Sequence, residues 1–376
     1  MIRRMIESVI REKLFGGKVI IISGPRQVGK TTLLKKIQEE AGLKSLWLNC
    51  DEPDIRSFLE EATSTELKKF TGDHKMIFID EAQRVKNIGI TLKLFVDNFP
   101  DIQVIATGSS ALELANTINE PLTGRKWEFQ LYPFSTGELV LHTSETEESR
   151  LLEQRLIYGL YPEIVNHPSR AAETIAVLAD SYLYKDLLSQ AAVRKPALLD
   201  RILTALALQL GQEVSFNELG QITGADSKTV EQYIQLLEKS YILFQLPAFS
   251  RNLRNEIKKG RKIYFCDNGI RNAIIKNFNP LALRQDTGAL WENWLVSERK
   301  KFNAYSGKTV NSYFWRTHAQ QEIDYVEEGG GRIAAIEFKW NEQHKAKLPE
   351  AFSKAYPDTQ FTTINRKNYM PFLTEG

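Results

Sequence analysis

The feature that most constrains the fold is a short glycine-containing segment, residues 24–31, that follows an apolar run near the N-terminus. It reads Gly-Pro-Arg-Gln-Val-Gly-Lys-Thr and fits the phosphate-binding pattern G-x-x-x-x-G-K-[ST]. Residues 19–22 are apolar and predict a buried strand, while Leu33, Leu34 and Ile37 predict a helix after the segment. This order directs backbone N–H groups and a helix N-terminus at a phosphate. The segment therefore predicts a nucleoside triphosphate site, with a ligand-free structural turn as the alternative.

The residue types in this loop indicate how it would hold ATP with Mg²⁺. Gly24 and Gly29 permit backbone angles and close approaches that a side chain would block. Lys30 supplies a point charge for the β- and γ-phosphates. The hydroxyl of Thr31 is placed to ligate Mg²⁺.

Three more apolar runs, residues 46–48, 76–79 and 102–106, predict further strands. Because they alternate with helical stretches, we expect a parallel sheet with helices on both faces and ligands at the carboxyl ends of its strands. The second run ends in Asp80 and Glu81, which resembles a Walker B segment: Asp80 supports Mg²⁺ and Glu81 polarises the attacking water, unless both are merely solvated acids. Thr107, after the last run, is either a polar nucleotide sensor or part of a turn. The expected nucleotide contacts are Gly24, Pro25, Arg26, Gln27, Val28, Gly29, Lys30, Thr31, Thr32 and Thr107.

Composition sets wider limits on the class of protein. The chain has 376 residues, 42% hydrophobic and 26% charged, which is ordinary for a globular protein of two or three domains. The formal net charge of +2 makes no global demand for nucleic acid, so any basic surface is local. Two cysteines without a C-x-x-C motif, and apolar runs too short to span a membrane, lead us to expect a cytoplasmic protein without zinc. The first fifteen residues predict an amphipathic helix packed on the core.

Five short segments together resemble one group of proteins, the bacterial and archaeal predicted ATPases of the AAA superfamily that carry a C-terminal domain of unknown function. They are residues 24–32, 79–83, 107–110, 122–125 and 131–134. The resemblance covers nearly the whole chain and implies ATP hydrolysis in a first domain, residues 1–135. It also implies that Arg125 is a γ-phosphate sensor or an arginine finger, acting in cis or from another subunit of a homo-oligomer. An arginine that bridges surface carboxylates is the alternative.

The middle of the chain, residues 136–280, predicts a helical segment followed by a fold that resembles a winged helix. A long helix is expected from Ala171 to Asp186, and a helix-turn-helix from residues 216–220 and 227–239, with Ser227 as N-cap. Residues 241–244 and 262–265 are the expected wing strands. The basic residues between and at these strands suit a nucleic-acid backbone: Arg251, Arg254, Lys258, Lys259, Arg261 and Lys262. The second helix carries Glu231 and Glu238 and has no basic face, so a structural packing role stays equally open.

The last domain, residues 281–376, contains a constellation typical of phosphodiester hydrolysis. Glu337 and Lys339 share one face of an expected strand, and Asp324 lies on a neighbouring strand. Two carboxylates that hold Mg²⁺ beside a lysine suit metal-assisted cleavage. This part resembles the PD-(D/E)XK nuclease fold, and the resemblance extends to Glu292 on the preceding helix. The alternative is the same fold without nuclease activity.

The sequence thus predicts an α/β protein: an AAA-type P-loop NTPase core with a parallel sheet, a helical and winged-helix domain, and a PD-(D/E)XK-like α/β domain. One expected function is an ATPase that binds or cleaves nucleic acid, and no membrane is expected as a partner. The other is a STAND-like regulatory switch that controls a protein partner, with an inactive nuclease-like scaffold. The expected catalytic residues are Lys30, Asp80, Glu81, Arg125, Glu292, Asp324, Glu337 and Lys339, and the expected metal ligands are Thr31, Asp80, Asp324 and Glu337.

Overall fold

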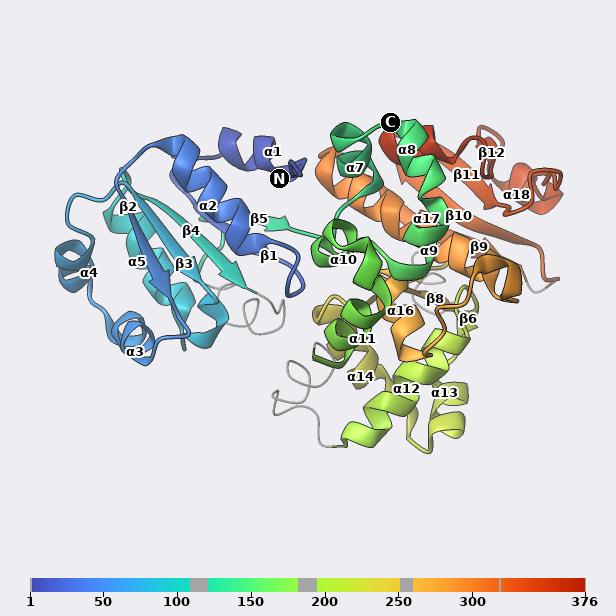
Figure 1. The fold of residues 1–376 in the computed structure, drawn as a ribbon, viewed down its shortest axis with the longest axis horizontal. Helices are drawn as coiled ribbons and strands as arrows, with labels where there is room; N and C mark the ends of the chain where they lie inside the picture. The colour runs from blue at the N-terminus through green and yellow to red at the C-terminus, as the bar shows by residue number, and fades with distance from the viewer. Residues whose placement is uncertain (1, 109–120, 182–194, 251–259, 318, 376) are drawn as a thin grey trace. The chain divides into compact units, whose positions relative to one another are not determined.

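The chain divides into two compact units in a computed structural model that describes residues 2–108, 121–181, 195–250, 260–317 and 319–375 (Figure 1). The N-terminal unit comprises Met1–Phe134 with Lys239–Tyr241, and the C-terminal unit comprises Ser135–Glu238 and Ile242–Gly376. The predicted boundary between residues 135 and 136 lies beside this division. The predicted boundary between residues 280 and 281 lies inside the C-terminal unit.

A five-stranded sheet forms the centre of the N-terminal unit, in the order β2-β3-β4-β1-β5 with every neighbouring pair parallel. This confirms the parallel α/β core expected from the apolar runs. The edge strand β5 was not among the predicted strands. The strands are β1 (Val19–Ser23), β2 (Ser45–Asn49), β3 (Met76–Asp80), β4 (Gln103–Gly108) and β5 (Lys126–Gln130).

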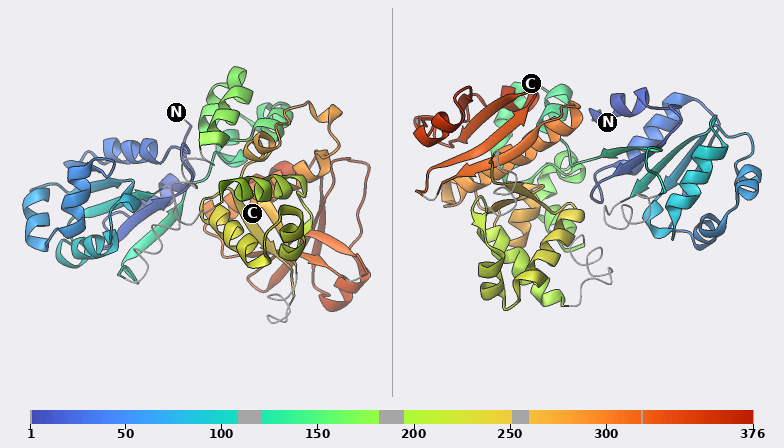
Figure 2. Two further views of the ribbon diagram at one scale, coloured as in Figure 1. Left: turned by 90° about the horizontal axis from the view of Figure 1, so that it is seen from below. Right: turned by 180° about the vertical axis from the view of Figure 1, so that it is seen from behind.

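Helices cover both faces of this sheet because alternate side chains of its strands point to opposite sides. Val19 and Ile21 of β1 pack with residues of α3, α4 and α5, whereas α2 lies on the other face (Figures 1 and 2). The helical elements are α1 (Ile6–Glu12), α2 (Lys30–Ala41), α3 (Pro53–Glu61), α4 (Ser64–Thr71), η1 (Ala82–Arg84) and α5 (Ile88–Asn98). The N-terminal helix is shorter than predicted. No helix in the described ranges is long and apolar enough to cross a membrane.

Ion pairs with buried arginines join helical segments of the C-terminal unit, both near its start and farther along the chain. Arg155 donates two hydrogen bonds of 2.9 Å to Glu148, and both side chains are almost fully buried. Arg284 binds Asp286 at 2.8 Å, and Arg271 pairs with the same carboxylate. The expected long helix begins at Ala171, and its predicted end at Asp186 lies outside the described residues. The helices are α7 (Thr136–His142), α8 (Glu145–Arg150), α9 (Leu152–Tyr158), α10 (Pro162–Asn166), η2 (Pro168–Arg170), α11 (Ala171–Ser181) and α12 (Pro196–Leu208).

The predicted helix-turn-helix and both wing strands correspond to observed elements. These are α13 (Phe216–Thr223), α14 (Ser227–Lys239), β7 (Leu243–Pro247) and β8 (Arg261–Phe265), and β6 (Glu213–Val214) completes an antiparallel sheet in the order β6-β8-β7. The prediction of Ser227 as N-cap is wrong. Asp226 caps α14, because its carboxylate accepts the backbone N–H of Thr229 at 2.8 Å, and Ser227 is already helical. The basic residues Arg251, Arg254, Lys258 and Lys259 lie outside the described residues.

The rest of the C-terminal unit is a mixed four-stranded sheet in the order β12-β11-β10-β9, in which β12 is parallel to β11 and the other pairs are antiparallel. Phe352 of α18 packs on one face against Trp315 and Ile323. Phe372 of α19 packs on Tyr325 and Phe338. The elements are α16 (Asn268–Ile274), η4 (Leu281–Leu283), α17 (Thr287–Tyr305), β9 (Asn311–Arg316), β10 (Glu322–Gly329), β11 (Arg332–Phe338), α18 (Glu350–Ala355), β12 (Gln360–Ile364) and α19 (Tyr369–Thr374).

The two sheets of the C-terminal unit are joined next to β7. Phe249 donates its backbone N–H to the carbonyl of Phe314 in β9 at 2.6 Å, beside an isolated bridge between Ala248 and Phe314. Helix α17 also contacts β8. The expected winged-helix and nuclease-like segments are therefore packed as one body.

Candidate functional site

The phosphate-binding loop lies at the carboxyl end of β1 and leads directly into α2. Gly24, Gln27 and Gly29 have positive φ angles of 155°, 59° and 91°. A Cβ at position 24 would lie 2.1 Å from the carbonyl oxygen of Leu131, whereas a Cβ at position 29 would have no neighbour closer than 4.0 Å. Gly24 is therefore required by packing against the chain after β5, and Gly29 by its backbone conformation alone.

Lys30 is folded back onto its own loop. Its ammonium donates hydrogen bonds to the carbonyl oxygens of Gly24 at 2.9 Å and Pro25 at 2.8 Å, and the residue is 6% exposed. Val28 is fully buried, and Thr32 is exposed on the first turn of α2. The loop thus keeps the lysine charge next to the backbone groups that would surround a phosphate.

Arg4 supports this loop from outside the motif, and the sequence analysis missed it. Its guanidinium donates to the carbonyl oxygens of Val28 at 2.7 Å and Tyr132 at 2.6 Å, and it stacks on the ring of Phe134. The residue is buried. An arginine within an amphipathic stretch gives no local sign that it will turn inward, so only the tertiary structure identifies it.

Asp80 is held from two directions at the carboxyl ends of the central strands. Thr31 donates its hydroxyl to Oδ2 at 3.0 Å, and Thr107 donates its hydroxyl to Oδ1. The backbone N–H of Glu81 donates to the hydroxyl oxygen of Thr107 at 3.3 Å. The structure therefore brings together four predicted residues, from α2, β3 and β4, around a single carboxylate.

Glu81 follows β3 in a left-handed conformation, with φ of 55°. The side-chain amide of Gln83 donates to its carboxylate, so Gln83 orients the residue expected to polarise water. Non-glycine residues in this conformation cost about 1–3 kcal/mol and cluster at functional sites. Cys50 lies beside this segment, and burial raises the pKa of its thiol to about 12, which keeps the sulfur neutral.

The residues at this edge of the sheet fit a magnesium–nucleotide complex. Mg²⁺ takes one or two protein oxygens and completes its shell with water and phosphate. Thr31 and Asp80 supply two such oxygens 3.0 Å apart, next to the N-terminus of α2. Mg²⁺ bound in this way needs only these two protein oxygens, since water and phosphate oxygens complete its shell.

Arg125 is not brought to this edge. Its carbonyl oxygen accepts the N–H of Val19, so it lies where β1 begins, about 13 Å of strand from the loop at roughly 3.3 Å per residue. Its guanidinium pairs with Asp97 at 2.7 Å, and both side chains are exposed. This placement matches the alternative of an arginine that bridges a surface carboxylate, and a role in another subunit stays a prediction.

The predicted nuclease-like residues do come together in the C-terminal unit. Lys339 binds Glu337 at 2.7 Å, and Asp324 accepts the backbone N–H of Phe338 at 2.8 Å. The β10–β9 register shifts between Ile323 and Val326, so Asp324 lies in an irregular part of its strand. Such irregularities re-aim side chains and are common beside functional sites.

Three further residues that the sequence analysis did not assign to this cluster complete it. Lys262 of β8 binds Glu292 at 2.9 Å and Glu322 at 2.5 Å, and Tyr264 donates its hydroxyl to Glu292 at 2.6 Å. Lys262 is only 1% exposed. The sequence does indicate that Lys262 and Tyr264 share one face of an expected strand. Their partners lie far away in the sequence, so the residues around β8 alone do not predict them.

The charges in this cluster shift each other's ionisation. Burial, followed by the negative charges of Glu292 and Glu337, raises the pKa of Asp324 well above its usual range. Burial alone would lower the pKa of Lys262, but Glu292, Asp324 and Glu322 outweigh it and raise the pKa. Lys262 is therefore a permanent cation at neutral pH.

The surroundings of these carboxylates differ from those of Asp80, because a buried ammonium lies among them. In the described part of the chain, no group of three or more His, Cys, Asp or Glu side chains is placed to hold a metal ion. Glu292, Asp324 and Glu337 each already accept a hydrogen bond from a protein donor. The role of Asp324 and Glu337 as metal ligands stays a prediction: the residues are neighbours, and the ammonium of Lys262 lies among the carboxylates of the cluster.

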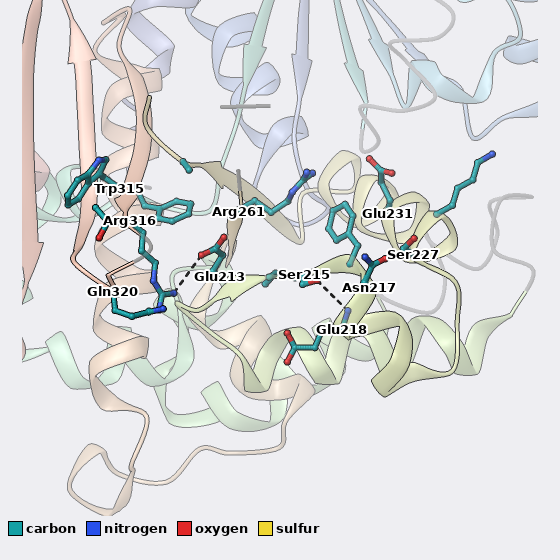
Figure 3. Close-up of a pocket in the computed structure, with 17 residues that line it drawn as sticks. Glu213, Ser215, Asn217, Glu218, Ser227, Glu231, Arg261, Trp315, Arg316 and Gln320 are labelled. Carbon is teal, nitrogen blue, oxygen red and sulfur yellow. Dashed lines mark hydrogen bonds and ion pairs between the residues drawn. The ribbon is translucent and has the colours of Figure 1, made fainter. Parts of the chain in front are cut away.

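A groove of about 1100 Å³ lies beside this cluster, between α13, α14, β8 and the end of β9 (Figure 3). Arg316 in its wall lies 3.7 Å from Glu213 and 3.9 Å from Glu322. Charges of both signs line it: Glu213, Glu218, Glu231, Lys228, Arg261 and Arg316. The groove therefore has no continuous basic track among the described residues.

Comparison with protein families divides the chain into three parts. Residues 16–140 match an AAA domain, residues 149–281 match a domain of unknown function (DUF8612), and residues 287–370 match another (DUF4143). The AAA match spans the loop, Asp80, Glu81 and Thr107. The boundary between the other two matches falls inside the C-terminal unit, between Lys262 and Glu292.

Uncharacterised proteins of bacteria and an archaeon resemble most of the chain. A Mycobacterium tuberculosis protein is 28% identical over 344 residues, 90% of this chain and 74% of the relative. A Haemophilus influenzae protein is 25% identical over 280 residues, 68% of each chain, and a Methanocaldococcus jannaschii protein is 24% identical over 298 residues, 68% of this chain and 62% of the relative. A Candida albicans Pif1 helicase structure aligns over 48% of each chain at 13% identity, but its TM-score of 0.27 is too low to indicate a shared overall fold. The motifs, the parallel sheet and these matches together show that the chain carries an AAA domain followed by C-terminal segments that match domains of unknown function.

Proposed function

We propose that the N-terminal unit binds ATP with Mg²⁺ and hydrolyses it. The observation that carries this proposal is the convergence of Lys30, Thr31 and Asp80 at the carboxyl ends of β1 and β3. Ligands of open parallel sheets bind at this edge. The AAA domain match supports nucleotide binding by the same residues.

Lys30 changes its hydrogen-bond acceptors when ATP binds. In the described state its ammonium is satisfied by two neutral carbonyl oxygens. Charged phosphate oxygens are stronger acceptors than neutral carbonyls, so they displace this arrangement and draw the ammonium toward the β- and γ-phosphates.

Thr31 and Asp80 would hold Mg²⁺, and the ion would supply positive charge next to the phosphates during phosphoryl transfer. The hydroxyl of Thr107 keeps Asp80 oriented. Glu81 orients the attacking water, and Gln83 positions the carboxylate of Glu81. Each residue then acts through an oxygen or nitrogen atom that already faces this edge of the sheet.

The test compares wild type with Lys30→Ala, Glu81→Gln and Lys35→Ala in ATP binding and steady-state hydrolysis. We expect Lys30→Ala to weaken ATP binding at least about tenfold, since a charged hydrogen bond is worth about 1.5–3 kcal/mol. We expect Glu81→Gln to retain binding and to lower kcat by about 10²-fold or more. Lys35 is an exposed lysine of the same helix and serves as the matched control, with no change expected.

Two outcomes would overturn the assignment. Wild type that binds no ATP in the presence of Mg²⁺ would contradict the site itself. Equal turnover by wild type and Glu81→Gln would contradict the role of Glu81 while leaving binding intact.

We propose second that ATP acts as a regulatory signal and that the C-terminal unit is a noncatalytic scaffold for a protein partner. The specific observation in favour is Lys262, which neutralises the nuclease-like carboxylates from within the unit. The mixed charges of the groove and of α14 point the same way, because nonspecific nucleic-acid binding depends on clustered basic residues.

Nucleic-acid work is the competing function, and one experiment separates the two. Wild type, Lys30→Ala and Lys339→Ala are incubated with plasmid, single-stranded DNA and RNA, with Mg²⁺ and ATP, at about 0.15 M salt. The scaffold proposal predicts no binding and no nicking by any of them. It also predicts that ATP changes hydrogen exchange in the C-terminal unit of wild type but not of Lys30→Ala. Nicking that is lost in Lys339→Ala would refute it.

A further inference from the structure

The carboxylate cluster of the C-terminal unit has a cation supplied by the chain itself. Lys262 reaches it from β8, a strand that belongs to a different sheet from Asp324 and Glu337. Its ammonium lies 2.9 Å from Glu292 and 2.5 Å from Glu322, and the ring of Phe314 lies 5.7 Å from it. These two charged contacts and the nearby aromatic ring fix the position of the ammonium.

Burial makes this pairing necessary for the charge of Lys262. A lysine that is 1% exposed cannot be stabilised by water, so its charge depends on the carboxylates around it. The side chains of Glu292 and Glu322 are 15% and 30% exposed, so loss of the lysine would leave their negative charges only partly compensated by water. Lys262 thus meets the same electrostatic need that a metal ion would meet in a nuclease.

Protein donors also occupy one oxygen atom of each carboxylate in the cluster. Glu292 accepts from both Lys262 and Tyr264 through Oε1. Asp324 accepts from the backbone of Phe338. An ammonium 2.9 Å from Glu292 and 2.5 Å from Glu322 repels a divalent cation placed among the same carboxylates, so the lysine charge disfavours Mg²⁺ there.

We propose that Lys262 is the resident cation of this cluster and that the C-terminal unit therefore takes no divalent metal ion among Glu292, Asp324 and Glu337. The lysine supplies the positive charge that a metal ion would otherwise supply. Removal of the lysine therefore allows a metal ion to bind among the carboxylates. This inference rests on the scaffold role proposed above and is independent of ATP hydrolysis. Lys339, which binds Glu337 at the partly exposed margin, does not have this role.

The experiment titrates Mn²⁺ into the nucleotide-free full-length protein and follows the free-ion signal by electron paramagnetic resonance. Wild type and Asp324→Asn are expected to bind the same amount of Mn²⁺. Lys262→Met, which replaces the ammonium by an uncharged side chain of similar length, is expected to gain one Mn²⁺ per chain. The gain is expected to disappear in the double variant Lys262→Met with Asp324→Asn. Lys339→Met, the matched removal of a lysine charge, is expected to match wild type.

Either of two results overturns the proposal. One is Mn²⁺ binding by wild type that Asp324→Asn abolishes, and the other is a folded Lys262→Met protein that binds no more Mn²⁺ than wild type. If Lys262→Met does not fold, the comparison of wild type with Asp324→Asn still decides. Failure here is distinct from failure of the scaffold role: Asp324-dependent Mn²⁺ binding without nicking refutes only the resident lysine, whereas nicking without such binding refutes only the scaffold.

Discussion

Substitution of Gly24 by alanine provides a quantitative test of how the nucleotide loop is built. The new Cβ would lie 2.1 Å from the carbonyl oxygen of Leu131, far inside van der Waals contact. That carbonyl cannot easily withdraw, because the N–H of Leu131 donates to Ser23 at 2.7 Å and continues the pairing of β1 with β5. Overpacking of this kind costs about 1–3 kcal/mol, and the φ of 155° adds about 1–3 kcal/mol for a residue with a Cβ. We expect Gly24→Ala to destabilise the N-terminal unit by about 4 kcal/mol.

Gly29→Ala is the matched substitution in the same loop. Its Cβ would make only an ordinary van der Waals contact, with the Cβ of Thr32 at 4.0 Å, so only the strain of φ at 91° remains, about 1–2 kcal/mol. Gly17→Ala, with φ of 68° and nothing within 4 Å, should cost about the same at a site outside the loop. The two loop variants should therefore differ by about 2–3 kcal/mol, although both alter an equally prominent glycine of the sequence motif.

Hydrogen exchange read by mass spectrometry gives the free energy of opening for peptides from β1 and β5, without interference from the C-terminal unit. The measurement uses nucleotide-free protein, because bound ATP would add its own stabilisation. A Gly24→Ala protein as stable as Gly29→Ala would refute the reasoning. It would mean that the loop relaxes away from Leu131 and that Gly24 is present for the phosphate alone.

Two further predictions concern the ion pairs of the C-terminal unit. Burial would raise the pKa of Asp286, but hydrogen bonds from Arg284 and Arg271 lower it to about 2. The ionised carboxylate therefore contributes to the free energy of unfolding above about pH 4, and this contribution is lost as the pH falls toward about 2. Asp286→Asn should lower the free energy of unfolding by about 2 kcal/mol at pH 7, and its urea midpoint should fall less than that of wild type as the pH is lowered from about 4 to about 2. Wild-type and Asp286→Asn midpoints that fall in parallel would contradict this prediction. Glu148→Gln should lower the free energy of unfolding by about 3 kcal/mol, because it leaves Arg155 buried without its charged partner. The same substitution at the exposed neighbour Glu147 should lower it by less than about 1 kcal/mol. Equal urea midpoints of the two variants would refute the importance of burial.

The nucleotide site could be predicted from the sequence because its signals are local. The loop motif and the carboxylates after an apolar strand are read from consecutive residues, and parallel strands carry their ends to one edge of the sheet. Strand β5 escaped prediction since it is a sheet edge, where charged Lys126 and Glu128 alternate with aromatic residues instead of forming an apolar run. Arg4 escaped because its partners, Val28 and Tyr132, are fixed only when the tertiary structure forms.

The carboxylate cluster of the C-terminal unit could be predicted only in part, because one of its members comes from a distant strand. Asp324, Glu337 and Lys339 were identified as neighbours from strand spacing, and the structure places them together. Lys262, however, was grouped with a basic stretch suited to nucleic acid, because in sequence it stands among other cations. Its buried pairing with Glu292 depends on the packing of α17 against β8, which no short-range pattern encodes.

The pairing of Lys262 with Glu292 also limits how these proteins can evolve by exchange of modules. The two residues lie in different sequence families, 149–281 and 287–370, yet they share one buried charge pair. A recombination event at the family boundary would bring in a foreign strand with no lysine for the carboxylates, or a foreign helix with no carboxylate for the lysine. In this chain the two segments are therefore expected to tolerate exchange only as a unit, and Lys262 and Glu292 to tolerate substitution only as a pair.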